Sequence, residues 1–357
     1  MKWKQEIMFR SEKAKNYILS IISLVLAIIL FCIGGEIVMR VWQKFQSHSG
    51  KTVKTILTID NELGWLPSPN YFFDGNKIDA SGKSYSVKIQ INDQGFRIFG
   101  NPREKNKNKV LFLGDSYTHA MEVSNNKTYY GLLSNALPME VFAFGGGGYG
   151  TLQEYMILDK YVDEIGPDII VIQFCYNDFI NNDYELELRS NKNNNGMRRP
   201  YLIRNQIIYK VPKRYADIRD EINKHSLFLY YLISRIDKIK AEHTSSVEEI
   251  IEEKGKTCPF FKESVDITEQ ILKKIKSRVP STTRVYAFSI DDNQPYYDEF
   301  KKISEQSGIH FIDGIPQAIR AAQQKGITTR FEDGAHWNET GHKIAADVLQ
   351  HYFEANL

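Results

Sequence analysis

The stretch Val110-Leu-Phe-Leu-Gly-Asp-Ser-Tyr117 decides the expected fold. Its first four residues are apolar and predict a short buried strand that ends at Gly114. The polar pair Asp115-Ser116 follows at once. In α/β proteins, ligands and chemistry lie at the carboxyl ends of such strands. Ser116 is therefore the first candidate for a reactive residue.

Four further apolar segments resemble this strand and alternate with helical patterns: Glu140–Phe144, Asp168–Phe174, Arg284–Ile290 and Ile309–Ile312. Short, continuously apolar strands separated by helices favour a parallel sheet covered on both faces. For one of these helices, Thr151 and Glu154 predict a capping box at the start, and Gly166-Pro167 predicts the end. A last helix, about 342–353, should close the fold with its apolar face.

The N-terminal region predicts a membrane anchor. No charge occurs from Asn16 to Gly35, and about 20 apolar residues suffice for a helix to cross a bilayer. A cleaved signal peptide is the main alternative, but the run is long and Glu36-Ile-Val-Met-Arg40 is unsuitable for cleavage. We therefore expect a cytoplasmic tail over 1–15 and an uncleaved transmembrane helix over 16–41. Five Lys or Arg residues before the uncharged run and four after it favour an external body, by a small margin.

The rest of the chain divides into segments with different hydrophobic patterns and turn signals. Residues 42–55 predict a linker, and 56–109 predict a β-rich lead-in with a half-buried strand at Tyr85–Ile91. The main domain spans 110–357. Within it, residues from 181 to about 260 interrupt the strand–helix alternation, with an Asn-rich start and a helical pattern after it. We expect a helical insertion or cap over the site there.

Composition excludes several classes of function. The chain has 357 residues, and its 46 basic side chains nearly balance 44 acidic ones, which makes nucleic acid an improbable partner. The three cysteines, Cys32, Cys175 and Cys258, are widely spaced. They favour neither a zinc site nor a disulfide framework. We expect no metal and no cofactor.

Ser116 needs a base, because a serine hydroxyl is a weak nucleophile. Of the eight histidines, His336 has a carboxylate at a useful spacing, within Asp333-Gly-Ala-His336. An Asp three residues before a His, across a turn with Gly, can reach the ring nitrogen and orient the base. Taken alone, the same pattern is more typical of a helix N-cap followed by a surface histidine.

Acyl transfer also needs donors for the oxyanion. Two further strand ends offer them: Gly145 opens the run Gly145-Gly-Gly-Gly-Tyr-Gly150, and Asn177 follows Phe174-Cys-Tyr. The glycine run could instead be a flexible loop or a phosphate loop. However, no Lys follows it and no acidic ribose partner is evident, so nucleotide binding fits poorly.

Together, Gly114-Asp-Ser116, Gly145, Asn177 and Asp333-x-x-His336 resemble the four blocks of the SGNH (GDSL) hydrolase superfamily. The resemblance implies a flavodoxin-like three-layer α/β/α fold. It also implies Ser116 as nucleophile, His336 as base oriented by Asp333, and an oxyanion hole of the Ser116 N–H, the Gly145 N–H and the Asn177 side chain. Two positions depart from the family pattern, Ala143 and Cys175, which leaves the choice of Gly145 over its neighbours open.

Three further features resemble the membrane-anchored bacterial members of this superfamily that are found with cell-surface polysaccharide pathways. They are the lead-in motif Asn92-x-x-Gly95-Phe-Arg97, the run Gly148–Gln153 and the N-terminal anchor. The resemblance implies an acylated extracytoplasmic carbohydrate as substrate, with acetyl as the first candidate for the acyl group, and a membrane-bound O-acyltransferase as a candidate partner. Water and a sugar hydroxyl both stay open as acceptors. Two alternatives remain. One is a non-catalytic subunit that scaffolds an acylation or export complex; the other is a lipid-directed esterase, whose insertion should show a broad apolar face.

Overall fold

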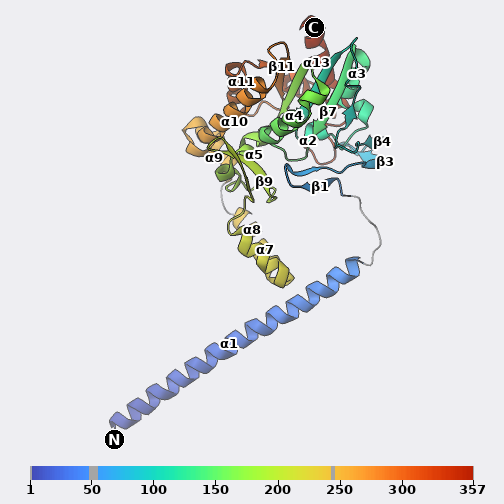
Figure 1. Cartoon of the computed structure of the whole chain (residues 1–357). Helices are drawn as coiled ribbons and strands as arrows, with labels where there is room; N and C mark the ends of the chain where they lie inside the picture. The colour runs from blue at the N-terminus through green and yellow to red at the C-terminus, as the bar shows by residue number, and fades with distance from the viewer. Residues whose placement is uncertain (1, 48–54, 243–245, 357) are drawn as a thin grey trace. The chain divides into compact units, whose positions relative to one another are not determined.

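The computed structural model describes residues 2–47, 55–242 and 246–356. The chain divides into two compact units (Figure 1). Residues 54–213 and 245–357 form the larger unit, which carries the α/β body. Residues 1–53 and 214–244 form the smaller unit, which joins the N-terminal helix to part of the insertion.

A six-stranded sheet, in the order β12-β11-β8-β6-β7-β5, forms the centre of the larger unit. Its strands are β5 (Ile98–Phe99), β6 (Asn108–Gly114), β7 (Met139–Gly145), β8 (Ile169–Phe174), β11 (Arg284–Ser289) and β12 (His310–Phe311). The five predicted strands are confirmed, and they pair in parallel. The sheet is nevertheless mixed, because β5 pairs antiparallel with β7 at the edge. Two residues are too few for a periodic signal, so the sequence did not predict β5.

The parallel strands have the flavodoxin-like order. Numbered along the chain, they stand 2-1-3-4-5, since β7, the second, lies outside β6, the first. The chain leaves β6 toward one side of the sheet to form β7 and then crosses to β8 on the other side. Folds of this type bind ligands at such a switch point, outside the carboxyl ends of the strands. Ser116 follows β6 at this point.

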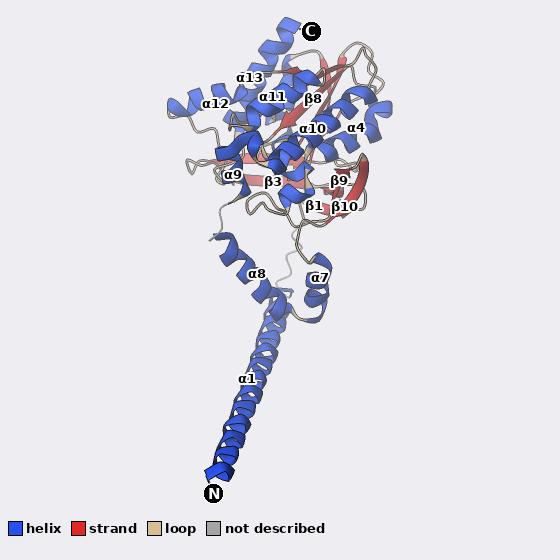
Figure 2. Cartoon of the chain, turned by 90° about the vertical axis from the view of Figure 1, so that its left-hand side faces the viewer, coloured by secondary structure: helices blue, strands red, loops and turns tan. Residues whose placement is uncertain are grey.

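Helices cover both faces of the sheet, as Figure 2 shows. Successive strand residues point to opposite faces. Leu111 and Leu113 pack into one core with α4 (Thr151–Ile165), α10 (Pro259–Arg278) and α11 (Tyr296–Gln306). Val110 and Phe112 pack into the other with α3 (Tyr129–Ala136), α12 (Ile315–Gln324) and α13 (Glu339–Asn356). The predicted three-layer architecture and closing helix are confirmed.

The start of α4 differs from the prediction. Thr151 is the first helical residue and Gly150 is the N-cap, so Thr151 and Glu154 do not form a capping box. Instead, Gln153 Oε1 accepts a hydrogen bond from the Gly150 N–H at 3.2 Å. The helix ends at Gly166 in the left-handed conformation, as predicted. Glu154 is buried, and its burial raises the pKa of its carboxyl well above the usual range.

The lead-in consists of two antiparallel hairpins, β1 (Leu57–Asp60) with β2 (Gly64–Pro67) and β3 (Phe72–Ile78) with β4 (Ser84–Gln90). Val87 and Ile89 of β4 are buried, which matches the alternation seen in the sequence. Trp65 of β2 lies in the core of the α/β body. The lead-in therefore packs onto the sheet rather than forming a separate domain.

The insertion is not purely helical. It contains α5 (Asn177–Asn182), α6 (Tyr184–Glu187), α7 (Ala216–His225), α8 (Leu227–Glu242) and α9 (Val247–Lys254). Between α6 and α7 lies the antiparallel hairpin β9 (Arg199–Ile203) and β10 (Gln206–Lys210). Tyr201 and Leu202 of this hairpin are buried. The hairpin escaped prediction because charged residues flank its short apolar runs.

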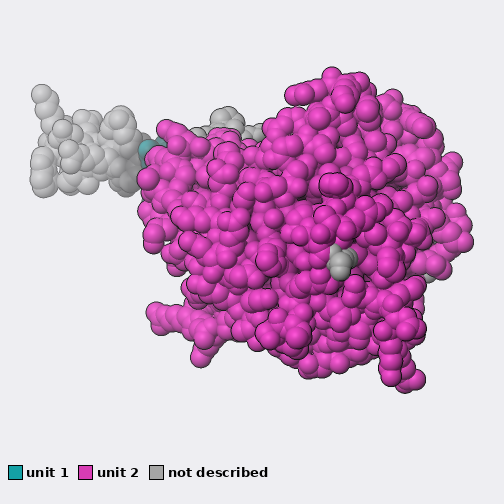
Figure 3. All heavy atoms as spheres, turned by 90° about the horizontal axis from the view of Figure 1, so that it is seen from above, with its two compact units in different colours: residues 1–53, 214–244 teal, residues 54–213, 245–357 magenta. Residues whose placement is uncertain are grey.

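Helix α1 (Lys2–Ser47) contains a span, Lys15–Val41, that is long and apolar enough to cross a membrane. Its mean hydropathy is 2.8, and a signal sequence would meet the same criteria. Figure 3 colours the smaller unit, to which this helix belongs, separately from the body. Of the predicted linker over 42–55, residues 42–47 continue the helix, and 48–54 lie outside the described residues.

Candidate active site

Three side chains from two distant parts of the sequence meet at the carboxyl end of β6. Ser116 begins the short helix α2 (Ser116–His119), and its Oγ lies 2.8 Å from Nε2 of His336. Nδ1 of the same ring lies 2.5 Å from Oδ2 of Asp333. A carboxylate only accepts hydrogen bonds, so Nδ1 carries the proton and Nε2 accepts from the serine hydroxyl. This is the tautomer that a general base needs.

Asp333 has two structural roles at once. While Oδ2 accepts from the imidazole, Oδ1 accepts from the backbone N–H of Ala335 at 2.8 Å and of His336 at 3.0 Å. Gly334, which lies between Asp333 and Ala335 in the sequence, has a φ of 71°. Asp333 is therefore not a helix N-cap, because α13 begins only at Glu339 and Asn338 accepts from its first turn. Its carboxylate instead closes a turn and contacts the imidazole at the same time.

The charges around His336 favour its protonated form. Burial of the ring lowers its pKa, but the charge of Glu122 and the hydrogen bond and charge of Asp333 outweigh this, so the pKa is raised above 6.5. Burial raises the pKa of Asp333, but the hydrogen bonds from His336 and Ala335 lower it by a larger amount. The net effect is a pKa below the usual value for Asp. Asp333 is thus ionised at neutral pH and can stabilise an imidazolium.

Glu122 is a neighbour that sequence reasoning missed. Ligand atoms of Glu122, Asp333 and His336 all lie within 4.8 Å of one another, the one such trio among the described residues. A cation there would compete with the bonds that His336 makes to Ser116 and Asp333. Burial raises the pKa of Glu122, against the opposing charges of His336 and Lys77. No local pattern relates Glu122 to His336, so only the fold reveals this pair.

Glu122→Gln is expected to move the acid limb of the pH profile of kcat/KM to lower pH. The base must be neutral to act, so activity rises with pH through the pKa of His336. Removing the Glu122 charge removes one of the groups that raise this pKa. Wild type should have its acid midpoint above 6.5. Glu332→Gln, an exposed acid beside Asp333, is the control and should leave the limb in place. An unmoved limb in Glu122→Gln would show that Glu122 carries no charge there.

Two arginine-centred contacts hold the serine and histidine loops. Arg97 is buried, and its Nη1 donates to the carbonyls of His119 and Ala120, both at 2.7 Å. This gives the lead-in motif a physical role, since Arg97 clamps the end of α2. On the other side, the Tyr117 hydroxyl donates to the carbonyl of Ala335 at 2.9 Å and accepts from Arg330 at 3.1 Å.

The two remaining predicted donors lie on the loops after β7 and β8. A Cβ at Gly145 would lie 2.2 Å from the backbone nitrogen of His119, so this position requires glycine. Gly146 donates its N–H to the carbonyl of Gly114 at 3.2 Å, which removes it from the donors open to a ligand. Asn177 donates to Oδ1 of Asn181 at 3.1 Å, and a hydrogen bond from its amide lowers the pKa of Asp115 against the larger effect of burial.

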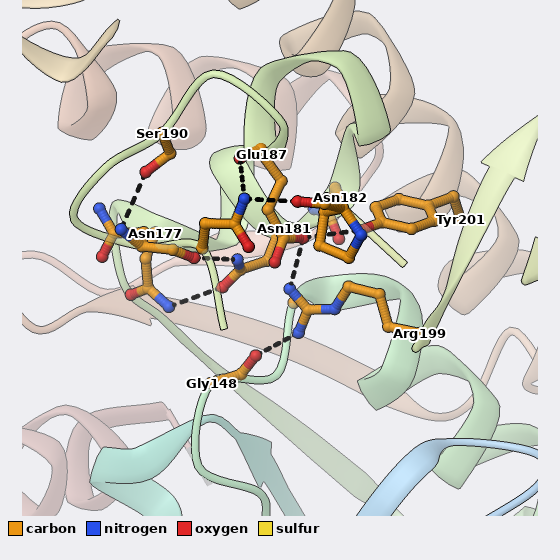
Figure 4. Close-up of polar contacts among 12 residues, drawn as sticks. Gly148, Asn177, Asn181, Asn182, Glu187, Ser190, Arg199 and Tyr201 are labelled. Carbon is orange, nitrogen blue, oxygen red and sulfur yellow. Dashed lines mark hydrogen bonds and ion pairs between the residues drawn. The ribbon is translucent and has the colours of Figure 1, made fainter. Parts of the chain in front are cut away.

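A buried ion pair from the insertion holds the glycine-rich loop, as Figure 4 shows. Nη1 of Arg199 donates to Oε2 of Glu187 at 2.9 Å, and both side chains are fully buried. Nη2 of Arg199 donates to the carbonyl of Gly148 and to Oε1 of Gln153. The Tyr201 hydroxyl also donates to Glu187, at 2.9 Å. The β9–β10 hairpin thus supports the loop that carries Gly145.

Arg199→Met is expected to lower the free energy of unfolding by about 3–5 kcal/mol, because it leaves Glu187 buried without its cation. Denaturant unfolding of the full-length protein in detergent measures this. Arg198→Met removes the adjacent, exposed arginine and should change stability little. Adding Glu187→Gln to Arg199→Met should restore part of the loss. Equal effects at positions 198 and 199 would refute the importance of the ion pair.

Two other histidines near the site are structural. Burial, and after it the charge of Arg97, lowers the pKa of His119 and of His342 to about 3. The His342 ring stacks on Tyr129 with 6.0 Å between the ring centroids. Both rings are neutral at physiological pH and belong to the core, which leaves His336 as the candidate base.

A family model described as GDSL-like Lipase/Acylhydrolase matches residues 110–349, and the chain belongs to this family. The chain is accordingly a serine-esterase type of enzyme, a hydrolase of ester bonds. The predicted membership of the SGNH (GDSL) superfamily is confirmed. No curated protein matches the chain.

Several solved structures are similar at low sequence identity. One is LAE5, an alpha/beta hydrolase from the metagenome of Lake Arreo, Spain, with 14% identity, 70% of this chain and 96% of that chain covered, and a TM-score of 0.40. Another is the psychrotrophic esterase EstA from Pseudoalteromonas sp., with 12% identity, coverage of 70% and 98%, and a TM-score of 0.37. A third is a catalytic mutant of the acetylxylan esterase Axe2 from Geobacillus stearothermophilus, with 13% identity, coverage of 70% and 95%, and a TM-score of 0.36.

Proposed function

We propose that Ser116, His336 and Asp333 are the catalytic triad of this esterase. Ser116 Oγ attacks the ester carbonyl carbon while Nε2 of His336 takes the hydroxyl proton, and Asp333 stabilises the resulting imidazolium. The observation that carries the proposal is the continuous chain of hydrogen bonds from Oγ through the imidazole to the carboxylate. A non-catalytic scaffold has no physical need for this arrangement.

The oxyanion is stabilised by the N–H groups of Ser116 and Gly145 and by the Asn177 amide. When the tetrahedral intermediate collapses, the ester C–O bond breaks, His336 returns the proton to the departing alcohol, and the acyl group stays on Ser116. His336 then takes a proton from water or from a sugar hydroxyl, whose oxygen attacks the acyl carbon. Release of Ser116 yields a carboxylic acid in the first case and a new ester in the second.

The proposed substrate is an O-acyl carbohydrate, most simply an acetylated one, outside the cell membrane. A cavity of about 280 Å³ beside Tyr117 and Ala335 supports this, because polar side chains form part of its lining, alongside apolar ones such as Ile290 and Ile319. The polar ones are acidic, amide and guanidinium groups: Asp291, Asp292, Asn293, Arg320 and Arg330. Such groups suit a ligand rich in hydroxyls.

Helix α1 supports membrane anchoring. With the body outside, protease added to spheroplasts should digest it; digestion only after membrane rupture would reverse the topology.

A lipid ester is the second candidate substrate. It is favoured by one observation, the apolar side chains that the insertion exposes on α7 and α8, including Ile218 and Ile236. An enzyme that acts on lipids needs a surface that contacts the bilayer. The charged and amide side chains of the cavity beside Tyr117 and Ala335 favour the carbohydrate.

Purified full-length protein is expected to release acetate from O-acetylated oligosaccharides with a higher kcat/KM than it releases fatty acid from phosphatidylglycerol in mixed micelles. Adding a radiolabelled, unacetylated oligosaccharide then distinguishes a sugar hydroxyl from water as the acceptor of the acetyl group. A labelled, acetylated product shows transfer, and free acetate alone shows hydrolysis. A membrane-bound O-acyltransferase is the proposed partner if transfer occurs. Fatty acid release without acetate release would instead establish the lipid esterase.

A further inference from the structure

The helices α7 and α8 are a part of the insertion that the proposed chemistry does not use. Residues 214–244, which include both helices, belong to the same compact unit as α1. Their contact with α1 is specific: Oε2 of Glu36 accepts hydrogen bonds from Ser226 Oγ at 2.8 Å and from the Phe228 N–H at 3.0 Å. A carboxylate from α1 thus caps the N-terminus of α8.

The same contact continues into the apolar span. The Phe228 ring packs edge-on against Phe31 of α1, with 5.3 Å between the centroids. A Cβ at Gly35 would lie 2.5 Å from this ring, so the glycine permits the close approach. Glu36 is the first charged residue after the uncharged run that ends at Gly35. The start of α8 therefore lies at the end of the uncharged run and near the C-terminal end of the apolar span at Val41, close to where a bilayer meets water.

Beyond this contact the two helices expose apolar side chains. In α8, Leu229 and Ile236 are 40% and 52% exposed and share a stripe with Leu232 and Ile233. In α7, Ile218 is 59% exposed. The opposite side of α8 is polar, with Ser234 exposed and Nε of Arg235 donating to the Tyr231 hydroxyl at 3.0 Å. The apolar run Leu227–Ile236 has the length of a short helix, well below the roughly 20 residues of a spanning one.

We propose that α7 and α8 lie in the interfacial layer of the lipid bilayer that α1 spans, with the stripe of Leu229 and Ile236 toward the acyl chains. Amphipathic helices with aliphatic and aromatic residues on one side and charges on the other bind there. The contact of α8 with the end of the α1 span selects lipid as the occupant of this surface. The inference rests on the membrane anchoring proposed above, and it gives the enzyme a second membrane contact.

Depth-dependent fluorescence quenching of the full-length protein tests the inference. In a Cys32→Ser background, where Cys175 and Cys258 are buried, Ile236→Cys is labelled with an environment-sensitive fluorophore. The protein is reconstituted into vesicles of phosphatidylglycerol and phosphatidylethanolamine. Nitroxide lipids should quench the label at a depth of roughly 5–10 Å below the headgroup surface, with a blue shift in emission and protection from aqueous iodide. Ser234→Cys, about 160° round the same helix, is the matched control and should be quenched by iodide.

Two results at Ile236 would overturn the inference: iodide quenching equal to that at Ser234, or protection from both iodide and nitroxide lipids. The latter would mean that a second copy or another protein covers the stripe. Leu26→Cys, in the middle of the α1 span, tests the anchor by itself. Lipid quenching at Leu26 without quenching at Ile236 refutes only the interfacial helices, whereas no lipid quenching at Leu26 refutes the anchor and the inference together.

Discussion

Ser116→Ala is expected to lower kcat for an acetyl ester by several orders of magnitude, up to roughly 10⁶-fold. The variant keeps the oxyanion donors but has no nucleophile to form the acyl-enzyme. Its stability should change by only about 1 kcal/mol, because one hydrogen bond, to His336, is lost at a partly exposed position. Steady-state kinetics and thermal unfolding measure the two effects on the same preparation.

A fluorophosphonate probe provides the direct readout for this variant. It should label wild type and fail to label Ser116→Ala. Ser277→Ala removes an exposed serine from α10 and is the matched control, with labelling and kcat like wild type. If Ser116→Ala kept most of the activity, the covalent mechanism would be wrong, and a water molecule activated by His336 would have to replace it.

Asp333→Asn is expected to lower kcat by up to ~10⁴-fold while the fold survives. Asn can still accept from the N–H groups of Ala335 and His336, so the turn is preserved. However, an amide N–H₂ in place of Oδ2 meets Nδ1 as a donor, which favours the tautomer with its proton on Nε2. That nitrogen could then no longer take the proton of Ser116.

The pH profile gives Asp333→Asn a second readout. Asp333 raises the pKa of His336 through its hydrogen bond and charge, so the acid limb should move to lower pH in the variant. A structural cap alone predicts neither change, because Asn caps as well as Asp does. Near wild-type kcat together with an unmoved acid limb would reduce the triad to a dyad of Ser116 and His336.

Much of the fold was predictable because its signals are local. Continuous apolar runs such as Val110–Leu113 predict buried parallel strands, and Gly166-Pro167 predicts the end of α4. The signals failed where elements are very short, as in β5, or where two caps compete, as at Gly150 and Thr151. The β9–β10 hairpin was missed because charged residues flank its short apolar runs. Its two-residue turn, Arg204-Asn205, also lacks the Gly that usually signals such a turn, although both residues have positive φ.

By itself, the sequence determined the fold class and the apolar span, and it proposed Asp333 as the partner of His336, because each depends on periodicity, composition or residues within one turn. Only the tertiary structure decided that Ser116 and His336, 220 residues apart, lie within hydrogen-bond distance. It also decided that Glu122 lies beside His336, that Arg199 supports the glycine loop, and that α8 is capped by Glu36 of α1. Such contacts join separate elements. They depend on how the whole sheet and its loops pack, and no local spacing in the chain encodes them.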